Sequence, residues 1–211
     1  KTDKYAGYAN GILGLAIGES NNYCTVGVSS GSPFYCLKTT HDTGSVIYDA
    51  MKYYNNETAV KIIATPHKMD KIGETEYYNF YPAFVDENMD SVFKNEGNKP
   101  IFVTSSGNGA SSGADSNLFA EARDPHVITV ADSTPNGGRA FWSAHGTSIL
   151  VNAPAGGSPN SIGANIYKPN PPTIGIDAPD QCEEDSFTPI GVGSSLVAGI
   201  AGLVKFEKQD L

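Results

Sequence analysis

Residues 100–109 read Pro-Ile-Phe-Val-Thr-Ser-Ser-Gly-Asn-Gly, an apolar run that passes directly into a turn of small and polar residues. From Ile101 to Thr104 every residue is apolar or β-branched, without the alternation of a half-exposed strand. Such a run is typical of a parallel strand that is buried on both faces. The stretch therefore predicts a central strand that ends near Thr104, with Asn108 in the turn that follows it.

Further strand and helix patterns lie on both sides of this stretch. Short β-branched or apolar runs predict strands at 25–28, 35–38, 60–64, 127–131, 140–143 and 149–152. Apolar residues at helical spacing predict helices over 7–18, 43–55, 82–95 and 194–211. Strands that alternate with helices are typical of an α/β fold with a doubly wound, mostly parallel sheet flanked by helices. Nothing marks a boundary, so residues 1–211 are predicted to form a single domain, and the Pro- and Asn-rich range 153–180 a long loop.

Composition excludes two classes of partner. The net charge is −9 and no Lys/Arg cluster occurs, which argues against nucleic-acid binding. No apolar run approaches the roughly 20 residues needed to span a bilayer, so membrane insertion is not expected. Three cysteines allow at most one intrachain disulfide, and three free thiols are the alternative. Asn56 begins the N-glycosylation triplet Asn-Glu-Thr.

Four segments, in chain order, resemble the subtilases, the subtilisin/kexin-like serine proteases of peptidase family S8. Residues 101–109 resemble the strand and turn that carry the oxyanion-hole asparagine, and 126–154 resemble the following "vItVgA … fS..G … v.APG" run. Residues 8–28 are similar to the family's histidine helix with the kexin-like "NN..CGVGV", and 196–203 to the end of its serine helix. The resemblance implies a subtilisin-like fold that lacks the first strand of the family, in a chain that is part of a longer polypeptide.

The position of the catalytic histidine is occupied by Tyr8. The family histidine lies six residues before the glycine of its Val-Ala-Gly, which is Gly14 here, and the pair Asn21-Asn22 supports the same register. A phenol has a reference pKa near 10 and lacks the second nitrogen of an imidazole. It is therefore not expected to accept a proton from serine while a carboxylate orients it.

The position of the nucleophile is occupied by Gly191. The family serine lies eight residues before the glycine of an Ala-Gly pair, and counting back from Gly199 gives Gly191, which has no side chain to attack a carbonyl. Ser194 and Ser195 lie about one helical turn further on, roughly 5 Å away. Because proton transfer needs heavy atoms about 2.6–3.2 Å apart, we interpret them as packing or surface serines.

Asn108 alone matches a catalytic position of the family, that of the oxyanion-hole donor. Without nucleophile or base it is expected to hold its turn by bonding nearby backbone. In the family the catalytic aspartate precedes the histidine by some tens of residues, so no residue of this sequence is assigned to its position. His145-Gly146-Thr147-Ser148 contains both "His-Gly-Thr" and "Gly-Thr-Ser", but it lies between predicted strands and not at the start of a helix, so no catalytic role is expected.

The resemblance also implies a disulfide between Cys24 and Cys182. In kexin-like enzymes a cysteine after the histidine helix pairs with one just before the serine motif, and Cys24 and Cys182 match those places, the second with an offset of about one residue. Such a bridge implies an extracellular or secretory location. Cys36 is left as a buried thiol or an intermolecular link. The resemblance allows a structural calcium ion, for which no ligands can be assigned, and no other cofactor is expected.

Loss of both nucleophile and base predicts a non-catalytic protein. The favoured hypothesis is a secreted pseudoprotease that serves as a binding module or a structural component, with protein partners or self-assembly. The alternative is an active serine endopeptidase of the same family that uses displaced residues.

Overall fold

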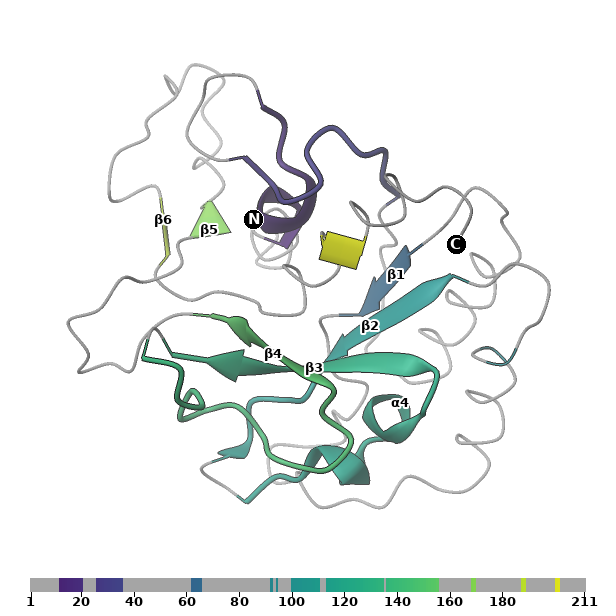
Figure 1. Ribbon diagram of the computed structural model, residues 1–211, viewed down its shortest axis with the longest axis vertical. Helices are drawn as coiled ribbons and strands as arrows, with labels where there is room; N and C mark the ends of the chain where they lie inside the picture. Colours follow the sequence, from purple (N-terminus) through teal and green to yellow (C-terminus); the bar gives the residue numbers. More distant parts are fainter. Residues whose placement is uncertain are drawn as a thin grey trace, which may run out of the picture.

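The computed structural model describes residues 12–20, 26–35, 62–65, 92, 94, 100–110, 113–134, 136–155, 168–169, 187–188 and 200–201. Its centre is a four-stranded parallel sheet with the order β1-β2-β3-β4, built from Ile62–Thr65, Ile101–Ser105, Val127–Ser133 and Val151–Pro154. Helical segments lie on both sides of this sheet, residues 12–17 above it and α4 below it (Figure 1). The fold is therefore α/β with a parallel sheet between helices, as the sequence predicts.

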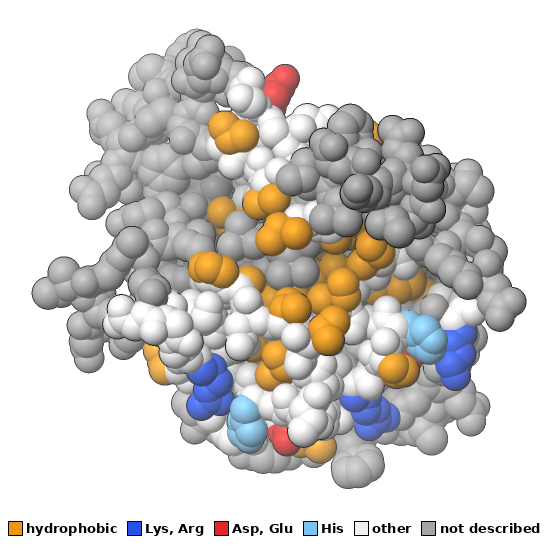
Figure 2. Space-filling view, viewed as in Figure 1, with side chains coloured by type: hydrophobic (Ala, Val, Ile, Leu, Met, Phe, Trp, Pro, Cys, Tyr) orange, Lys and Arg blue, Asp and Glu red, His pale blue; other side chains and the backbone are white. Residues whose placement is uncertain are grey.

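Strand β2 is the most buried strand, which explains its continuous apolar run. Phe102, Val103 and Thr104 are all at most 3% exposed, so both faces of the strand are covered. On one face Val103 packs with Val130 of β3 and Ala153 of β4. Four aliphatic side chains surround that cluster and remain partly exposed, namely Ile62, Ile101, Ile128 and Val151. Hydrophobic side chains accordingly gather across the middle of the face seen in Figure 2.

The opposite face of the sheet packs against one short helix, α4, which in turn packs against a second short helix, η2. Residues Ser116–Leu118 form the 3-10 helix η2, and Ala120–Arg123 form α4. A second buried cluster joins them, made of Ala114, Phe119, Ala122 and Ala144. The hydroxyl of Thr129 in β3 donates to the carbonyl of Ala122 over 2.7 Å, so a polar residue is accommodated in the buried strand.

Segment 26–29 closes the end of the helical segment 12–17 and does not form a strand. The N–H of Val28 donates to Leu15 O over 3.1 Å, and the N–H of Ser29 donates to Ala16 O over 2.8 Å. The last turn of a helix leaves its carbonyls without N–H donors, and this segment supplies the donors. Gly27 crosses the helix end so closely that its N–H donates to Gly18 O over 2.9 Å.

Several predicted element boundaries need correction. The strand predicted at 25–28 is wrong for the described residues 26–28, for the reason just given, and Tyr35, at the start of the strand predicted at 35–38, is not in a strand. Residues 140–143 form a turn, closed by the N–H of Ser143 on Ala140 O over 3.0 Å. The strand predicted at 149–152 begins two residues later as β4. The strands predicted at 60–64, 101–104 and 127–131 are confirmed as β1, β2 and β3.

The long loop predicted over 153–180 contains a short strand. Lys168–Pro169, β5, pairs antiparallel with Phe187–Thr188, β6. Within the described residues, helix is found at 12–17 and 200–201 inside two of the predicted helices, and Val92 is helical inside a third. The helix predicted over 43–55 lies outside the described residues.

Candidate functional site

The turn after β2 presents Asn108 to solvent. Its neighbours on both sides, Gly107 and Gly109, are buried, whereas Asn108 itself is exposed. Gly107 has φ 103°, a backbone conformation that side-chain-bearing residues rarely adopt. The turn predicted from the sequence is therefore confirmed. Asn108 is exposed in this turn, between two buried glycines.

Backbone hydrogen bonds hold this turn on both sides of Asn108. The N–H of Ser106 donates to Val130 O over 2.8 Å, which fastens the start of the turn to β3. The N–H of Ala144 donates to Gly107 O over 2.8 Å, and the N–H of Ala110 donates to Trp142 O over 3.1 Å. Asn108 therefore lies between two points at which segment 140–144 is bonded to its turn.

The side chain of Asn108 does not hold the turn, contrary to the sequence-based expectation. Among the described residues it has no hydrogen-bond partner, while the backbone bonds just described satisfy the adjacent peptide groups. Asparagine carries two amide donors and one acceptor. An exposed amide on a turn that is fixed from both sides can donate to an oxygen of a bound molecule.

A network of side chains behind the turn was not predicted from the sequence. Ser106 Oγ and Ser143 Oγ are 3.2 Å apart, and both residues are 1% exposed. Ser143 Oγ also accepts from the N–H of Asp132 over 2.9 Å. The indole N–H of Trp142 donates to Asp132 Oδ2 over 2.8 Å. The adjacent pair Trp142-Ser143 lies in the range that the sequence predicted as a strand, and nothing in that range indicated the network.

Most of the other predicted site residues lie outside the described part of the chain. These are Tyr8, Gly191, Cys24, Cys36, Cys182 and Asn56. Gly14, from which Tyr8 was counted, lies in the helical segment 12–17. The register assignments at Tyr8 and Gly191 and the Cys24–Cys182 pairing therefore stay predictions.

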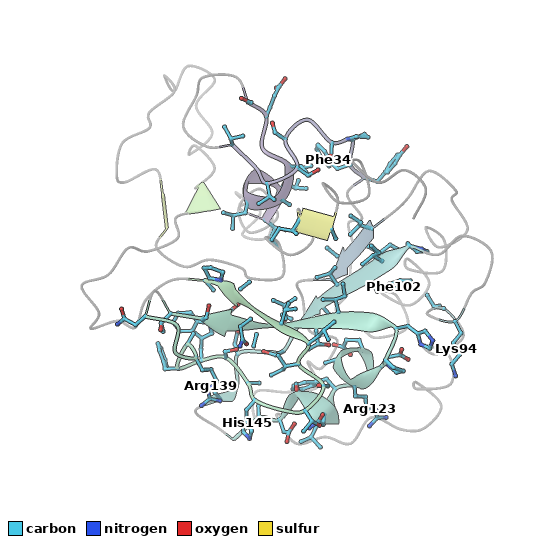
Figure 3. The ribbon with its side chains drawn as sticks, in the orientation of Figure 1. Phe34, Lys94, Phe102, Arg123, Arg139 and His145 are labelled. Carbon is cyan, nitrogen blue, oxygen red and sulfur yellow. The ribbon has the colours of Figure 1, made fainter. Side chains whose placement is uncertain are left out.

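The segment His145-Gly146-Thr147-Ser148 is a loop, as expected, and not the start of a helix. Its residues are bonded to η2: the N–H of Ser116 donates to His145 O over 2.6 Å, and Ser148 Oγ lies 2.7 Å from Ser116 Oγ. His145 lies below the sheet, whereas the helical segment 12–17 lies above it (Figure 3). The strings His-Gly-Thr and Gly-Thr-Ser therefore lie on the opposite side of the sheet from residues 12–17, which belong to the segment that resembles the family's histidine helix.

Within the described residues, no group of three or more His, Cys, Asp or Glu side chains is placed to hold a metal ion. Within the same residues, no helix has the length and apolar character that crossing a membrane requires.

Comparison with known proteins identifies the fold. No protein-family model and no curated protein matches the sequence. Among solved structures, the PatG macrocyclase domain matches with a TM-score of 0.67 and 14% identity over 97% of this chain and 55% of that chain. A protease structure from Pseudoalteromonas arctica matches with a TM-score of 0.64 and 20% identity over 95% of this chain and 58% of that chain.

A cold adapted subtilisin-like serine proteinase matches with a TM-score of 0.57 and 15% identity over 94% of this chain and 60% of that chain. The chain thus spans less than two thirds of the length of these three structures. Because the similarity extends along nearly the whole of this chain, we conclude that it has the fold of the subtilisin-like proteases. The fold resemblance stated from the sequence is confirmed.

Proposed function

We propose that this chain is a catalytically inactive pseudoprotease of the subtilisin/kexin type, which acts outside the cell as a binding module or a structural component. The observation that carries the proposal is the combined substitution at two family positions, Tyr8 for the histidine and Gly191 for the serine. The sheet and the Asn108 turn are kept. Function depends on the site and not on the fold, and this site has lost the groups that perform acyl transfer.

The loss of the base is the stronger half of the argument. Two markers, Gly14 and the pair Asn21-Asn22, both put Tyr8 at the histidine position. A serine hydroxyl is a weak nucleophile unless an adjacent base takes its proton. A tyrosine at this position removes that base, whichever serine takes the role of nucleophile.

The alternative, an active serine endopeptidase with displaced residues, has one specific observation in its favour. The Ala-Gly pair occurs twice, at 198–199 and 201–202. Counting eight residues back from Gly202 reaches Ser194, so this second register supplies a nucleophile where the first supplies none. The exposed amide of Asn108 suits either function. Ser194 is therefore the residue to control for in any test of activity.

Incubation with a diverse peptide library, followed by mass spectrometry, tests the proposal. We expect no cleavage above that of a blank, because no imidazole lies at the position of the base. The variant S194A serves as the matched control for the second register. Cleavage by the natural chain that disappears in S194A would establish the endopeptidase and reject the pseudoprotease.

The secreted location rests on the proposed Cys24–Cys182 disulfide. In the chain-entropy model, closing a loop of this length stabilises the fold by roughly 4–5 kcal/mol. We expect peptide mapping of the unreduced native protein to recover the two cysteines in one linked pair of peptides, separated by reduction. A free thiol at Cys24 in the native protein would remove this support for an extracellular location.

A structural component would assemble with its own copies or with protein partners. The size of the native material separates the two forms of the proposal. A single small species in native mass measurement indicates a binding module, and a regular series of multiples indicates self-assembly.

A further inference from the structure

Segment 140–144 lies along the turn that carries Asn108 and is bonded to it at three points. Two are the backbone bonds from Ala144 and Ala110 described above, at 2.8 and 3.1 Å. The third is the pair of hydroxyls on Ser106 and Ser143, 3.2 Å apart. Asn108 lies between these points in the sequence and is exposed.

Ser143 is the residue at which this segment, the turn and β3 meet. Its hydroxyl oxygen accepts from the N–H of Asp132 over 2.9 Å and faces Ser106 Oγ. Its carbonyl accepts from Arg139 Nη1 over 3.1 Å, and its N–H donates to Ala140 O. The side chain is 1% exposed, so a lost bond here leaves a buried polar group without a partner.

We propose that Ser143 is the positioning residue of the Asn108 turn: through Ser106, its hydroxyl fixes the turn against the end of β3 and thereby sets the orientation in which Asn108 faces solvent. The hydroxyl pair adds a side-chain bond to the backbone bonds that hold the turn, whereas the Asn108 side chain contributes none among the described residues. The inference deepens the proposed function, since it concerns Asn108, the one catalytic position of the family that this sequence matches.

The test is S143A in the full chain, with S116A as matched control. Ser116 and Ser148 form another hydroxyl pair, 2.7 Å apart, which joins η2 to the loop that contains His145, and Ser116 is fully buried. Both variants therefore remove the hydroxyl of a buried serine that is paired with another serine. The readouts are the side-chain amide signals of Asn108 and the hydrogen exchange of individual backbone amides by nuclear magnetic resonance.

In S143A we expect the Asn108 side-chain signals to move and the exchange of the Ala110 and Ala144 amides to rise about tenfold, the equivalent of one lost hydrogen bond. In S116A we expect those signals to stay in place, while exchange rises at Leu118 and Phe119, whose amides bond Asp115 O and Ser116 O. Equal changes at Asn108 in both variants, or none in S143A, would overturn the proposal.

If S143A does not fold, S106A replaces it, because that variant removes the same hydroxyl pair and leaves the Asp132 bond to Ser143 intact. These readouts do not depend on whether the chain hydrolyses peptides. Cleavage of a peptide library would reject the pseudoprotease and leave the positioning role of Ser143 standing. Unchanged Asn108 side-chain signals in S143A would reject the positioning role and leave the pseudoprotease standing.

Discussion

Replacing Gly27 by alanine is expected to destabilise the protein by about 3 kcal/mol, which for a chain of this size lowers Tm by roughly 6–12 °C. A Cβ at Gly27 would meet backbone atoms of the helix end, with the carbonyl carbon of Ile17 at 2.6 Å and the nitrogens of Ile17 and Gly18 closer still. Backbone cannot rotate away as a long side chain does. The crossing would have to open, and with it the bonds from Gly27, Val28 and Ser29 to the helix carbonyls.

The matched control for this variant is G138A. A Cβ at Gly138 would meet only Thr134 Oγ1, at 3.4 Å, which is ordinary contact. Thermal unfolding followed by circular dichroism should therefore show little change in Tm for G138A. Equal Tm values for G27A and G138A would mean that segment 26–29 does not cross the helix end as described.

Replacing Gly146 by alanine is expected to cost a similar amount, about 3 kcal/mol, from two causes. Its φ of 150° disfavours a side chain. A Cβ would also clash with Ser116 Oγ, and would lie 2.6 Å from Asp115 Oδ1. The change would break the hydroxyl pair of Ser116 and Ser148 and separate the 145–148 loop from η2.

The variant G137A separates these two causes. Gly137 also has positive φ, 78°, but a Cβ there would meet nothing within 4 Å. Its cost is therefore the backbone term alone, about 1 kcal/mol. The difference in the free energy of unfolding between G146A and G137A, measured by urea titration, gives the cost of the clash together with the stricter backbone conformation at Gly146. No difference would show that the loop does not approach Ser116 closely.

The sheet could be predicted from the sequence because its strands carry their own signal. Strands buried on both faces need continuous apolar runs, and the runs at 101–104 and 127–131 have no polar alternation. Segment 25–28 carries a similar signal, but the N–H groups of Gly27 and Val28 meet the carbonyls of Gly18 and Leu15 in place of a neighbouring strand. A local pattern does not reveal which partner a backbone group finds.

The candidate site could be predicted only in part. The turn follows from the Ser-Gly-Asn-Gly that comes directly after the strand, whereas the exposure of Asn108 was not predicted. The network behind it joins Ser106 to Ser143 across 37 positions in the sequence, and a serine in a turn gives no sign of so distant a partner. Asn108 was expected to hold its own turn, because asparagine commonly does so. Here the buried serines and the backbone take that role.

We propose that a subtilisin-like fold persists here without a working nucleophile. The intact mass of the native chain decides this after incubation with a fluorophosphonate, which bonds covalently to activated serines. We expect an unchanged mass for the natural chain, with an active serine protease labelled alongside it as positive control. An increase by one probe adduct, absent in S194A, would reject the proposal and identify Ser194 as an activated nucleophile.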